Sequence, residues 1–224
     1  MSYSLDALRR DCESGKTHKF LFFYGHTPPT DGSINQSCFS QWWMQDFEVN
    51  GVRYCCAEQY MMAEKARLFG DNSMLESIMK TAFPKEMKAY GRAVQNFDQG
   101  EWDAHCVQIV KDASRAKFTQ NADLLAFLLG TKNRVLVEAS PRDRIWGIGM
   151  GKDNPDAENP LKWRGRNLLG FALTEVRDEI LAAHPSCRNF DIKEVEPWYG
   201  RKSIDGDSLP LQSESEDERG KRND

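Results

Sequence analysis

The sequence of 224 residues lacks the features that mark several classes of protein. It has no run of about 18 apolar residues, so we expect no membrane-spanning helix. Its first 19 residues are polar, without the apolar stretch of a secretory signal. The formal net charge is −4, whereas proteins that wrap duplex nucleic acid are usually basic. This composition leaves room for a local basic pocket that binds one phosphorylated ligand.

The six cysteines and four histidines show no pattern typical of a metal site. No CxxC or HExxH spacing occurs, so we expect no bound metal. Cysteines this sparse in a chain of this length favour free thiols and a cytoplasmic or nuclear compartment over a disulfide scaffold. The sequence also lacks the GxGxxG, Walker A and GxSxG motifs, and we expect no cofactor.

Apolar runs divide the sequence into short strands and longer helices. Residues 20–24 and 134–139 predict two buried strands. Residues 47–55 predict a hairpin, because Asn50 and Gly51 readily adopt the positive φ angles of a type I′ turn. Amphipathic segments predict helices at 57–69, 71–80, 84–95, 101–118, 121–129 and 165–183.

The order of these elements predicts the fold class. Strands and helices do not alternate regularly, which favours an α+β fold, a compact and mostly helical single domain with a few short strands. Asp71 is a candidate N-cap. Residues 1–19 are charged and predict a loosely packed lead-in before a domain at 20–183. Residues 184–224 predict an extension that is disordered from about residue 203, where apolar residues become scarce.

A first candidate site lies on the predicted helix at 57–69. Glu58 and Lys65 are seven residues apart, about 20° short of two full helical turns, so both side chains project from one face. An acid and an amine at this spacing could both reach one small ligand. The alternative is an ordinary solvated face, which is the commonest use of Glu and Lys.

A second candidate site follows the strand predicted at 134–139. Asp143 and Trp146 lie close to Gly147 and Gly149. The tryptophan could stack on a base or a sugar, and the glycines could let the backbone approach a phosphate. The alternative is structural, with Asp143 as a turn cap and Trp146 as a core anchor.

Two further sets of residues could contact a ligand. Arg164, Arg166 and Asn167 precede the last predicted helix, and the start of a helix can bind anions. The alternative is that Asn167 simply caps this helix. The aromatic residues Phe39, Trp42, Trp43 and Trp102 could line a site or, as most tryptophans do, belong to the core, and Trp43 and Trp102 are the candidates chosen.

Taken together, the sequence resembles the NADAR family, also called YbiA-like. The resemblance covers these stretches in order, from residue 23 to residue 180: FYGHTPPTDGSINQSCFSQWW, FEVNGVRYCCAEQYMMAEKARLFGD, KAYGRAV, Trp102, KFTQNADLLAFLLGT, VLVEASPRDRIWGIG and WRGRNLLGFALTEVRDEI. It implies a compact, helix-rich α+β catalytic domain at 20–183 that hydrolyses N-glycosidic bonds. One branch of the family acts on ribose-phosphate aminopyrimidines of early riboflavin biosynthesis, and another removes ADP-ribose from guanine bases in nucleic acid.

The resemblance also implies a site. Its catalytic residues would be Glu58, Lys65 and Asp143. Residues that bind substrate would be Trp43, Trp102, Trp146, Gly149, Arg164 (with Arg166 near it) and Asn167. The loop at 25–37 and the extension at 184–224 depart from the shared core.

The chemistry of N-glycoside cleavage suggests a role for each catalytic residue. Asp143 would stabilise positive charge at the sugar carbon or activate water, and Glu58 would move the proton. A neutral Lys65 could instead form a Schiff base with the opened sugar, which requires burial to lower its pKa against the rise that Glu58 would cause.

The expected partner is an ADP-ribosylated guanine in DNA or RNA, because the additional loop and extension suggest more than a minimal metabolic domain. A ribose-phosphate small molecule of riboflavin biosynthesis is the alternative substrate. Two other classes stay open, namely an ADP-ribose-binding module without catalysis and a nucleic-acid-associated protein that acts through its acidic tail.

Overall fold

The computed structural model describes residues 3–184, which form an α+β fold made mostly of helices, and this confirms the predicted class. The elements are α1 (Leu5–Glu13), β1 (Phe20–Phe23), a 3-10 helix (Gln36–Phe39), β2 (Phe47–Val49), β3 (Val52–Tyr54), α2 (Ala57–Leu68), α3 (Asn72–Lys80), α4 (Pro84–Ala93), α5 (Gln99–Thr119), α6 (Ala122–Leu129), β4 (Val135–Glu138), a 3-10 helix (Pro160–Lys162) and α7 (Leu168–Ala183).

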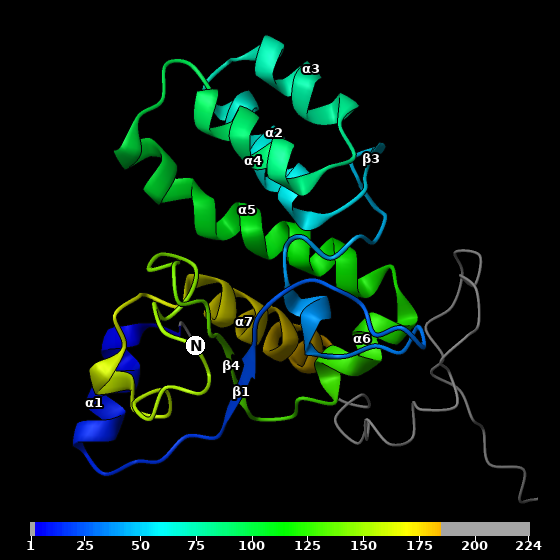
Figure 1. The fold of residues 1–224 in the computed structure, drawn as a ribbon. Coiled ribbons are helices and arrows are strands. Elements are labelled where there is room, and N and C mark those ends of the chain that lie inside the picture. The colour runs from blue at the N-terminus through cyan, green and yellow to red at the C-terminus, as the bar shows by residue number, and fades with distance from the viewer. Residues whose placement is uncertain (1–2, 185–224) are drawn as a thin grey trace, which may run out of the picture.

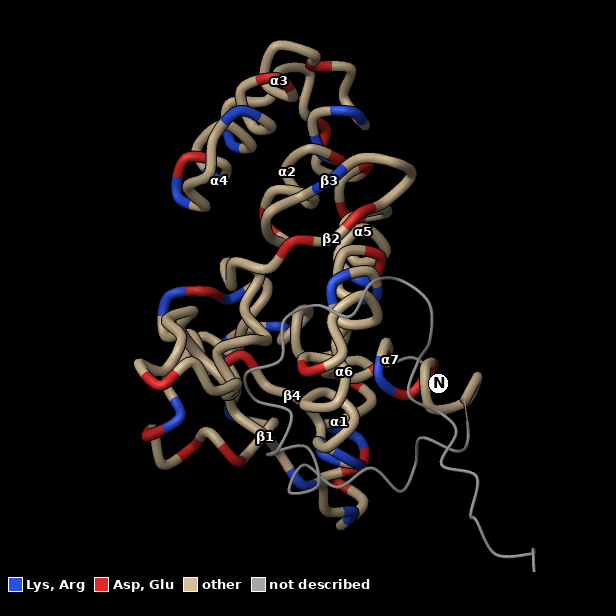
Figure 2. The backbone as a smooth tube through the Cα atoms, turned by 90° about the vertical axis from the view of Figure 1, so that its right-hand side faces the viewer, with Lys and Arg blue, Asp and Glu red and all other residues tan. Residues whose placement is uncertain are grey.

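Helix α5 runs between two parts of the domain (Figure 1). Helices α2, α3 and α4 pack together on one side of it, and α7 packs on the other side against β4, which pairs with β1. Figure 2 shows the same division from the side, with acidic and basic residues spread over both parts. Segments that are distant in sequence therefore meet along α5.

The strands form two small sheets. β2 and β3 make the predicted hairpin, with φ of 52° at Asn50 and 76° at Gly51. β1 and β4 pair in parallel, so that Phe23 lies opposite Glu138 at the carboxyl end of both strands. Polar residues at this end can face a common space, as in other parallel sheets.

Helix α7 covers the edge of β4 that β1 leaves unpaired. The Asn167 side chain accepts a hydrogen bond from the Glu138 amide (2.9 Å) and donates one to the Leu136 carbonyl (3.0 Å). The Thr174 hydroxyl accepts from the Leu136 amide (3.0 Å). These side chains replace a neighbouring strand, because buried backbone groups need partners.

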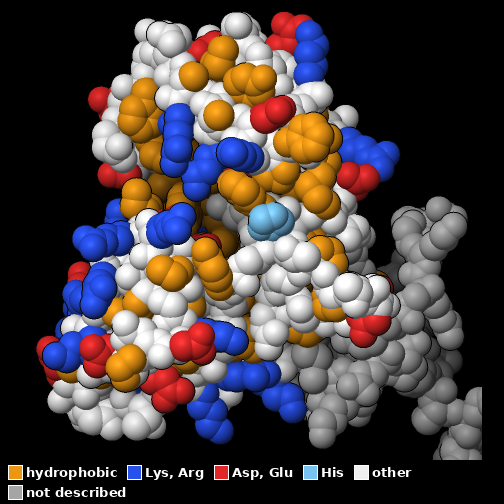
Figure 3. All heavy atoms as spheres, viewed as in Figure 1, with side chains coloured by type: hydrophobic (Ala, Val, Ile, Leu, Met, Phe, Trp, Pro, Cys, Tyr) orange, Lys and Arg blue, Asp and Glu red, His pale blue; other side chains and the backbone are white. Residues whose placement is uncertain are grey.

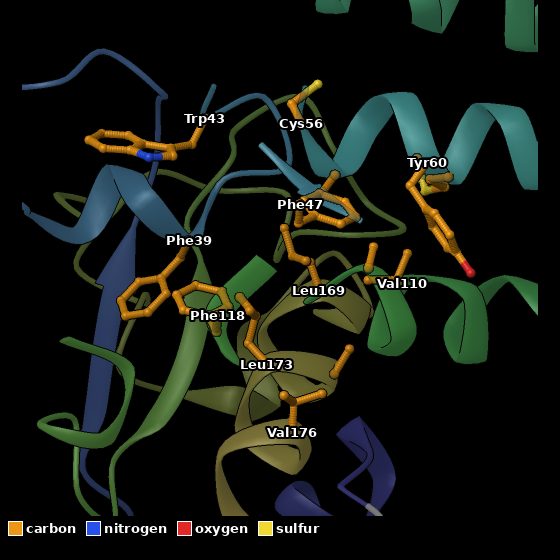
Figure 4. Packing of buried hydrophobic residues seen from close by; sticks show 14 of the residues in the cluster. Phe39, Trp43, Phe47, Cys56, Tyr60, Val110, Phe118, Leu169, Leu173 and Val176 are labelled. Carbon is orange, nitrogen blue, oxygen red and sulfur yellow. The ribbon is translucent and has the colours of Figure 1, made fainter. Parts of the chain in front are cut away.

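Helix α2 lies inside the main hydrophobic cluster. Figure 4 shows residues of α5 and α7, such as Val110 and Leu173, gathered beside the start of this helix. All residues from 57 to 63 are buried. Because the first two turns of α2 are enclosed on all sides, Glu58 is carried into the interior together with its apolar neighbours.

The N-terminal segment differs from the expected loosely packed lead-in. Residues 5–13 form α1, which Ser4 caps by accepting a hydrogen bond from the Ala7 amide. Leu8 is buried in a second hydrophobic cluster, and Arg9 donates to the carbonyls of Pro160 and Trp163. The many charged residues of this N-terminal segment mask the pattern of its one apolar face. The extension at 184–224, apart from His184, lies outside the described residues.

Other boundaries shifted for local reasons. Asp71 caps α3 as predicted, because its side chain accepts a hydrogen bond from the Met74 amide. α7 begins at Leu168 and not at residue 165, since residues 164–167 instead pair with the loop that follows β4.

The contact between α7 and β4 gives a prediction for stability. A Cβ atom at Gly170 would lie 2.1 Å from the Leu136 carbonyl oxygen, so Gly170→Ala must push the helix away from the strand. We expect the free energy of unfolding to fall by about 1–3 kcal/mol, as for other overpacked cores. Urea denaturation would measure it. Gly100→Ala, where the added Cβ meets only the Asp98 carboxylate at 3.3 Å, should cause no such loss. Equal stability of Gly170→Ala and wild type would contradict the tight packing.

Candidate active site

Glu58 is a buried carboxyl group with an open hydrogen-bonding position. Its side chain interacts with the Trp42 indole N–H, while Oε1 has no partner among the described residues. The next residue, Gln59, is equally buried but is bonded to the Cys55 amide and the Ile78 carbonyl. Burial raises the pKa of Glu58 to about 7, against the positive charge of Lys88. An unsatisfied buried acid of this kind favours function over packing.

Glu138, at the carboxyl end of β4, is a half-buried residue that brings a second carboxyl group. Its Oε2 is shielded from solvent and has no partner in the described part of the chain. Burial raises the pKa of Glu138 to about 8, the negative charges of Asp143 and Glu58 raise it further, and Lys88 opposes them. The Asn167 side-chain oxygen accepts a hydrogen bond from the Glu138 backbone N–H and so fixes the position of this residue.

Asp143 brings a third carboxyl group to the same place. Its Oδ1 accepts hydrogen bonds from the amides of Ile145 (2.9 Å) and Trp146 (2.8 Å), so it does cap a turn, as the structural alternative held. Its charge also raises the pKa values of Glu58 and Glu138. The predicted pair of Glu58 and Asp143 therefore shares one electrostatic centre with Glu138.

Two cations of helix α4 face these carboxyl groups. Lys88 and Arg92 both lower the pKa of Glu58. They flank Gly91, where an added Cβ would lie 2.0 Å from the Met62 sulfur, so α4 packs very closely on α2. Figure 3 shows Lys and Arg side chains over α4, directly above a hollow between the two parts of the domain.

Trp42, and not the predicted Trp43, lies at the centre. Trp43 is only 5% exposed and packs in the main hydrophobic cluster. Trp42 is half-buried, and its ring lies between His26 (centroids 5.3 Å apart) and the Lys88 Nζ (5.9 Å). Adjacent residues of an irregular segment point in different directions, which sequence patterns do not specify.

A cavity of about 560 Å³ adjoins this centre. It is lined by residues 22–27, 35–37, Ala139, Pro141 and 151–153. His26 lines the cavity and its ring is tilted by 58° against that of Trp42, and Ala139, the residue after Glu138, also lines it. The loop at 25–37, which departs from the family pattern, forms part of this cavity.

Lys65 lies farther along α2, beside aromatic rings. Its Nζ is 4.1 Å from the centroid of Phe97 and 5.5 Å from that of Trp102. Among the described residues no hydrogen bond or ion pair joins it to Glu58. Burial lowers the pKa of Lys65, and the positive charge of Arg92 lowers it further. Lys65 therefore lies beside Trp102, and the positive charge of Arg92 acts on both Lys65 and Glu58.

The remaining predicted residues belong to one ribbon of chain. Residues 144–148 and 164–169 exchange backbone hydrogen bonds, including Arg164 N–H to the Ile148 carbonyl (3.0 Å) and Arg166 N–H to the Arg144 carbonyl (2.9 Å). The two segments pack so closely that a Cβ at Gly165 would lie 2.2 Å from the Gly147 carbonyl oxygen. We call residues 144–148 and 164–169 the paired ribbon.

Two expected ligand-binding residues have structural roles in this ribbon. The Gly149 N–H is bonded to the Asp143 carbonyl and is not free for a phosphate; Gly149, with φ of 69°, completes the turn. Asn167 is fully buried, and both ends of its amide are bonded to β4. Its role is therefore positioning of Glu138. Trp146 is half-buried against the main cluster, and Arg164 is exposed.

Sequence reasoning missed Glu138, Lys88 and Arg92, and it chose Trp43 over Trp42 from the aromatic candidates. Glu138 had a usable signal, because an acid that ends a buried strand lies where parallel sheets commonly carry ligands. Lys88 and Arg92 are four residues apart on a predicted helix, and only the packing of α4 on α2 shows that they face the acids.

Residues 3–184 also lack a metal cluster, a disulfide and a membrane-spanning helix. No three His, Cys, Asp or Glu side chains gather as a metal site within residues 3–184. The cysteines of that range are all free. No helix there is both long and apolar enough to cross a bilayer.

The geometry can supply both a proton and a negative charge to one bond. Glu58 and Glu138 keep protons near neutral pH because they are buried, while Asp143 is half-buried and held by two amides. Pairs of carboxyl groups in unlike environments are the means by which sugar hydrolases divide acid and base roles.

The NADAR domain model matches residues 22–181. An N-glycosidase of Acanthamoeba polyphaga mimivirus is 43% identical over 169 residues, which cover 73% of this chain and 98% of that protein. The N-glycosidase YbiA of Escherichia coli is 32% identical over 64% of this chain and 79% of its own length. The NMR structure of E. coli YbiA superposes with a TM-score of 0.59 at 28% identity, covering 75% of this chain and 88% of that one.

The raised pKa values predict how stability depends on pH. An acid with a raised pKa in the folded state stabilises that state less as pH rises from its ordinary 4.5 through its folded value. We expect the free energy of unfolding to fall between pH 4.5 and 8, by about 3 kcal/mol for Glu58 and about 5 kcal/mol for Glu138. Denaturation across pH should show a smaller fall for Glu58→Gln and Glu138→Gln.

Glu48→Gln, at an exposed position on β2, is the matched control and should keep the wild-type dependence. If the two buried variants followed the same curve as wild type, neither acid would retain its proton in the folded protein.

Proposed function

The chain belongs to the NADAR domain family, and from this premise we infer that it is a hydrolase that cleaves N-glycosyl bonds. The observation that carries this function is the meeting of two buried, protonatable carboxyl groups, Glu58 and Glu138, with Asp143. This combination suits a bond whose cleavage needs a proton on the leaving nitrogen and a negative charge near the sugar carbon.

In the proposed mechanism, protonated Glu58 donates its proton to the leaving nitrogen. The bond between the ribose C1 and that nitrogen breaks, and its electron pair departs with the base. A water oxygen bonds to C1 while the water proton passes to Asp143, whose charge also stabilises the positive sugar carbon. Transfer of that proton to Glu58, with Glu138 as the neighbouring proton reservoir, restores the starting state.

A covalent route through Lys65 is a second candidate, because burial and Arg92 both lower the pKa of its amine. In this route Nζ bonds to C1, the base leaves with a proton, the sugar ring opens, and an imine joins Lys65 to C1. Water then hydrolyses the imine. This route requires a substrate that reaches from Trp102, beside Lys65, to Glu58.

We propose ADP-ribosylated guanine in nucleic acid as the substrate. Lys88 and Arg92 beside the carboxyl groups, together with the exposed Arg164, would attract a substrate that carries phosphates. The cavity of about 560 Å³ offers room beyond the scissile bond for a large nucleotide. A ribose-phosphate aminopyrimidine, which needs less space, is the comparison substrate.

Activity should depend on the proton of Glu58. We expect wild type to release ADP-ribose from an ADP-ribosylated guanine oligonucleotide faster than it cleaves the ribose-phosphate aminopyrimidine. Glu58→Gln should lower kcat about 10²- to 10⁴-fold, and Glu48→Gln should not. Because the acid must be protonated, wild-type kcat should fall above pH of about 7–8. Preference for the aminopyrimidine would overturn the substrate, and full activity of Glu58→Gln would overturn the mechanism.

Borohydride trapping separates the two routes. Reduction during turnover should leave a mass of the sugar-bearing fragment on Lys65 if the imine forms, and mass spectrometry of peptides would locate it. Lys111→Ala, at another lysine with a perturbed pKa, is the matched control. The absence of an adduct, together with activity that survives Lys65→Ala, removes the covalent route and leaves the direct attack of water.

A further inference from the structure

Four exposed arginines lie in the paired ribbon or flank Asp143 in the segment that leads into it: Arg142, Arg144, Arg164 and Arg166. We call them the arginine cluster. None of their guanidinium groups has a hydrogen bond or ion pair within residues 3–184. Most other arginines of that range are engaged with carboxylates, carbonyls or hydroxyls, namely Arg9, Arg53, Arg67, Arg115, Arg134 and Arg177. The cluster is therefore a local concentration of unpaired positive charge.

The paired ribbon holds most of this cluster together. Arg144 Cγ and Arg164 Cβ both lie 3.1 Å from the position that a Cβ would take on Gly149. The Arg166 N–H donates to the Arg144 carbonyl at 2.9 Å. The backbone is fixed by these contacts, so three guanidinium groups project from a rigid base and Arg142 lies two residues before Arg144.

The setting of the cluster indicates its ligand. Unpaired like charges crowded on one surface repel one another, so a counter-charge from outside would stabilise them, and the chain as a whole carries −4. Arginine presents a planar fork that matches phosphate oxygens. Ile145, 53% exposed, offers an apolar contact between the charges for a sugar or a base. A row of phosphates joined by sugars fits this combination.

We propose that the arginine cluster binds the single-stranded sugar-phosphate backbone next to the modified guanine, so that the chain selects nucleic acid over a free nucleotide. This inference rests on the proposed function and adds to it the surface that holds the strand. Asp143, which lies between Arg142 and Arg144 in sequence, is coupled to Glu58 and Glu138. A strand held by the cluster would therefore deliver its base beside the acids.

The test compares two substrates with the same scissile bond. One is ADP-ribosylated guanine in a DNA strand of about 20 nucleotides, a length well beyond common single-strand site sizes, and the other is the ADP-ribosylated guanine mononucleotide. The ratio of their kcat/KM values is measured for wild type and for the double variant Arg144→Gln/Arg166→Gln. We expect the ratio to fall about tenfold in the double variant. Arg10→Gln, at an unpaired exposed arginine on α1, is the matched control and should keep the wild-type ratio.

A binding measurement that does not depend on turnover accompanies the kinetics. Fluorescence anisotropy reports the affinity of the same variants for an unmodified, labelled strand at several salt concentrations. The slope of log K against log salt should decrease by about 0.7 for each arginine removed. Thermal unfolding checks that the variants are folded, which is expected because only exposed ends change.

Each outcome decides between the proposals. Equal losses on both substrates would show that the cluster binds the ADP-ribose part, and would overturn the inference. An unchanged ratio and an unchanged salt slope would also overturn it. If wild type cleaves neither substrate but strand binding weakens with the arginines removed, the strand-binding surface stands and the proposed function fails.

Discussion

The site depends on the two hydrogen bonds by which the Asn167 side chain holds the backbone of strand β4. Its amide satisfies the Glu138 N–H and the Leu136 carbonyl at once, on an edge that would otherwise need another strand. This one side chain therefore joins the start of α7, the end of β4 and the position of the Glu138 carboxyl group. A residue that resembles a ligand-binding amide in sequence is used to build the frame around the ligand.

The frame matters because it brings like charges together out of water. Glu58 comes from a helix enclosed on all sides, and Glu138 from the end of a strand. Burial keeps both acids protonated near neutral pH, which avoids the repulsion that three carboxylates would suffer. The positive charge of Lys88 limits the rise in pKa of both acids, and that of Arg92 limits the rise for Glu58. The balance leaves acid groups that can give up a proton at modest cost, which suits proton transfer.

Local signals explain what could be predicted from the sequence. The hairpin at Asn50, the helix that carries Glu58 and the turn at Asp143 each depend on a few neighbouring residues, and all three were found. Glu138 was missed because its environment arises from packing between distant segments. Periodicity places a residue on a face of its own element, and it does not say which other element covers that face. The same limit caused Trp43 to be chosen over its neighbour.

The backbone and the side chains of the paired ribbon have separate roles, which many active sites combine. Its backbone is locked by hydrogen bonds and by close glycine contacts, while the exposed arginine side chains at 144, 164 and 166 have no hydrogen bond or ion pair among residues 3–184. Replacement of those side chains would leave the acids where they are. Changes of side chain on the ribbon could thus alter which ligand the protein recognises while the carboxyl groups stay in place. Relatives that share one chemistry and differ in their targets would be expected from such a division.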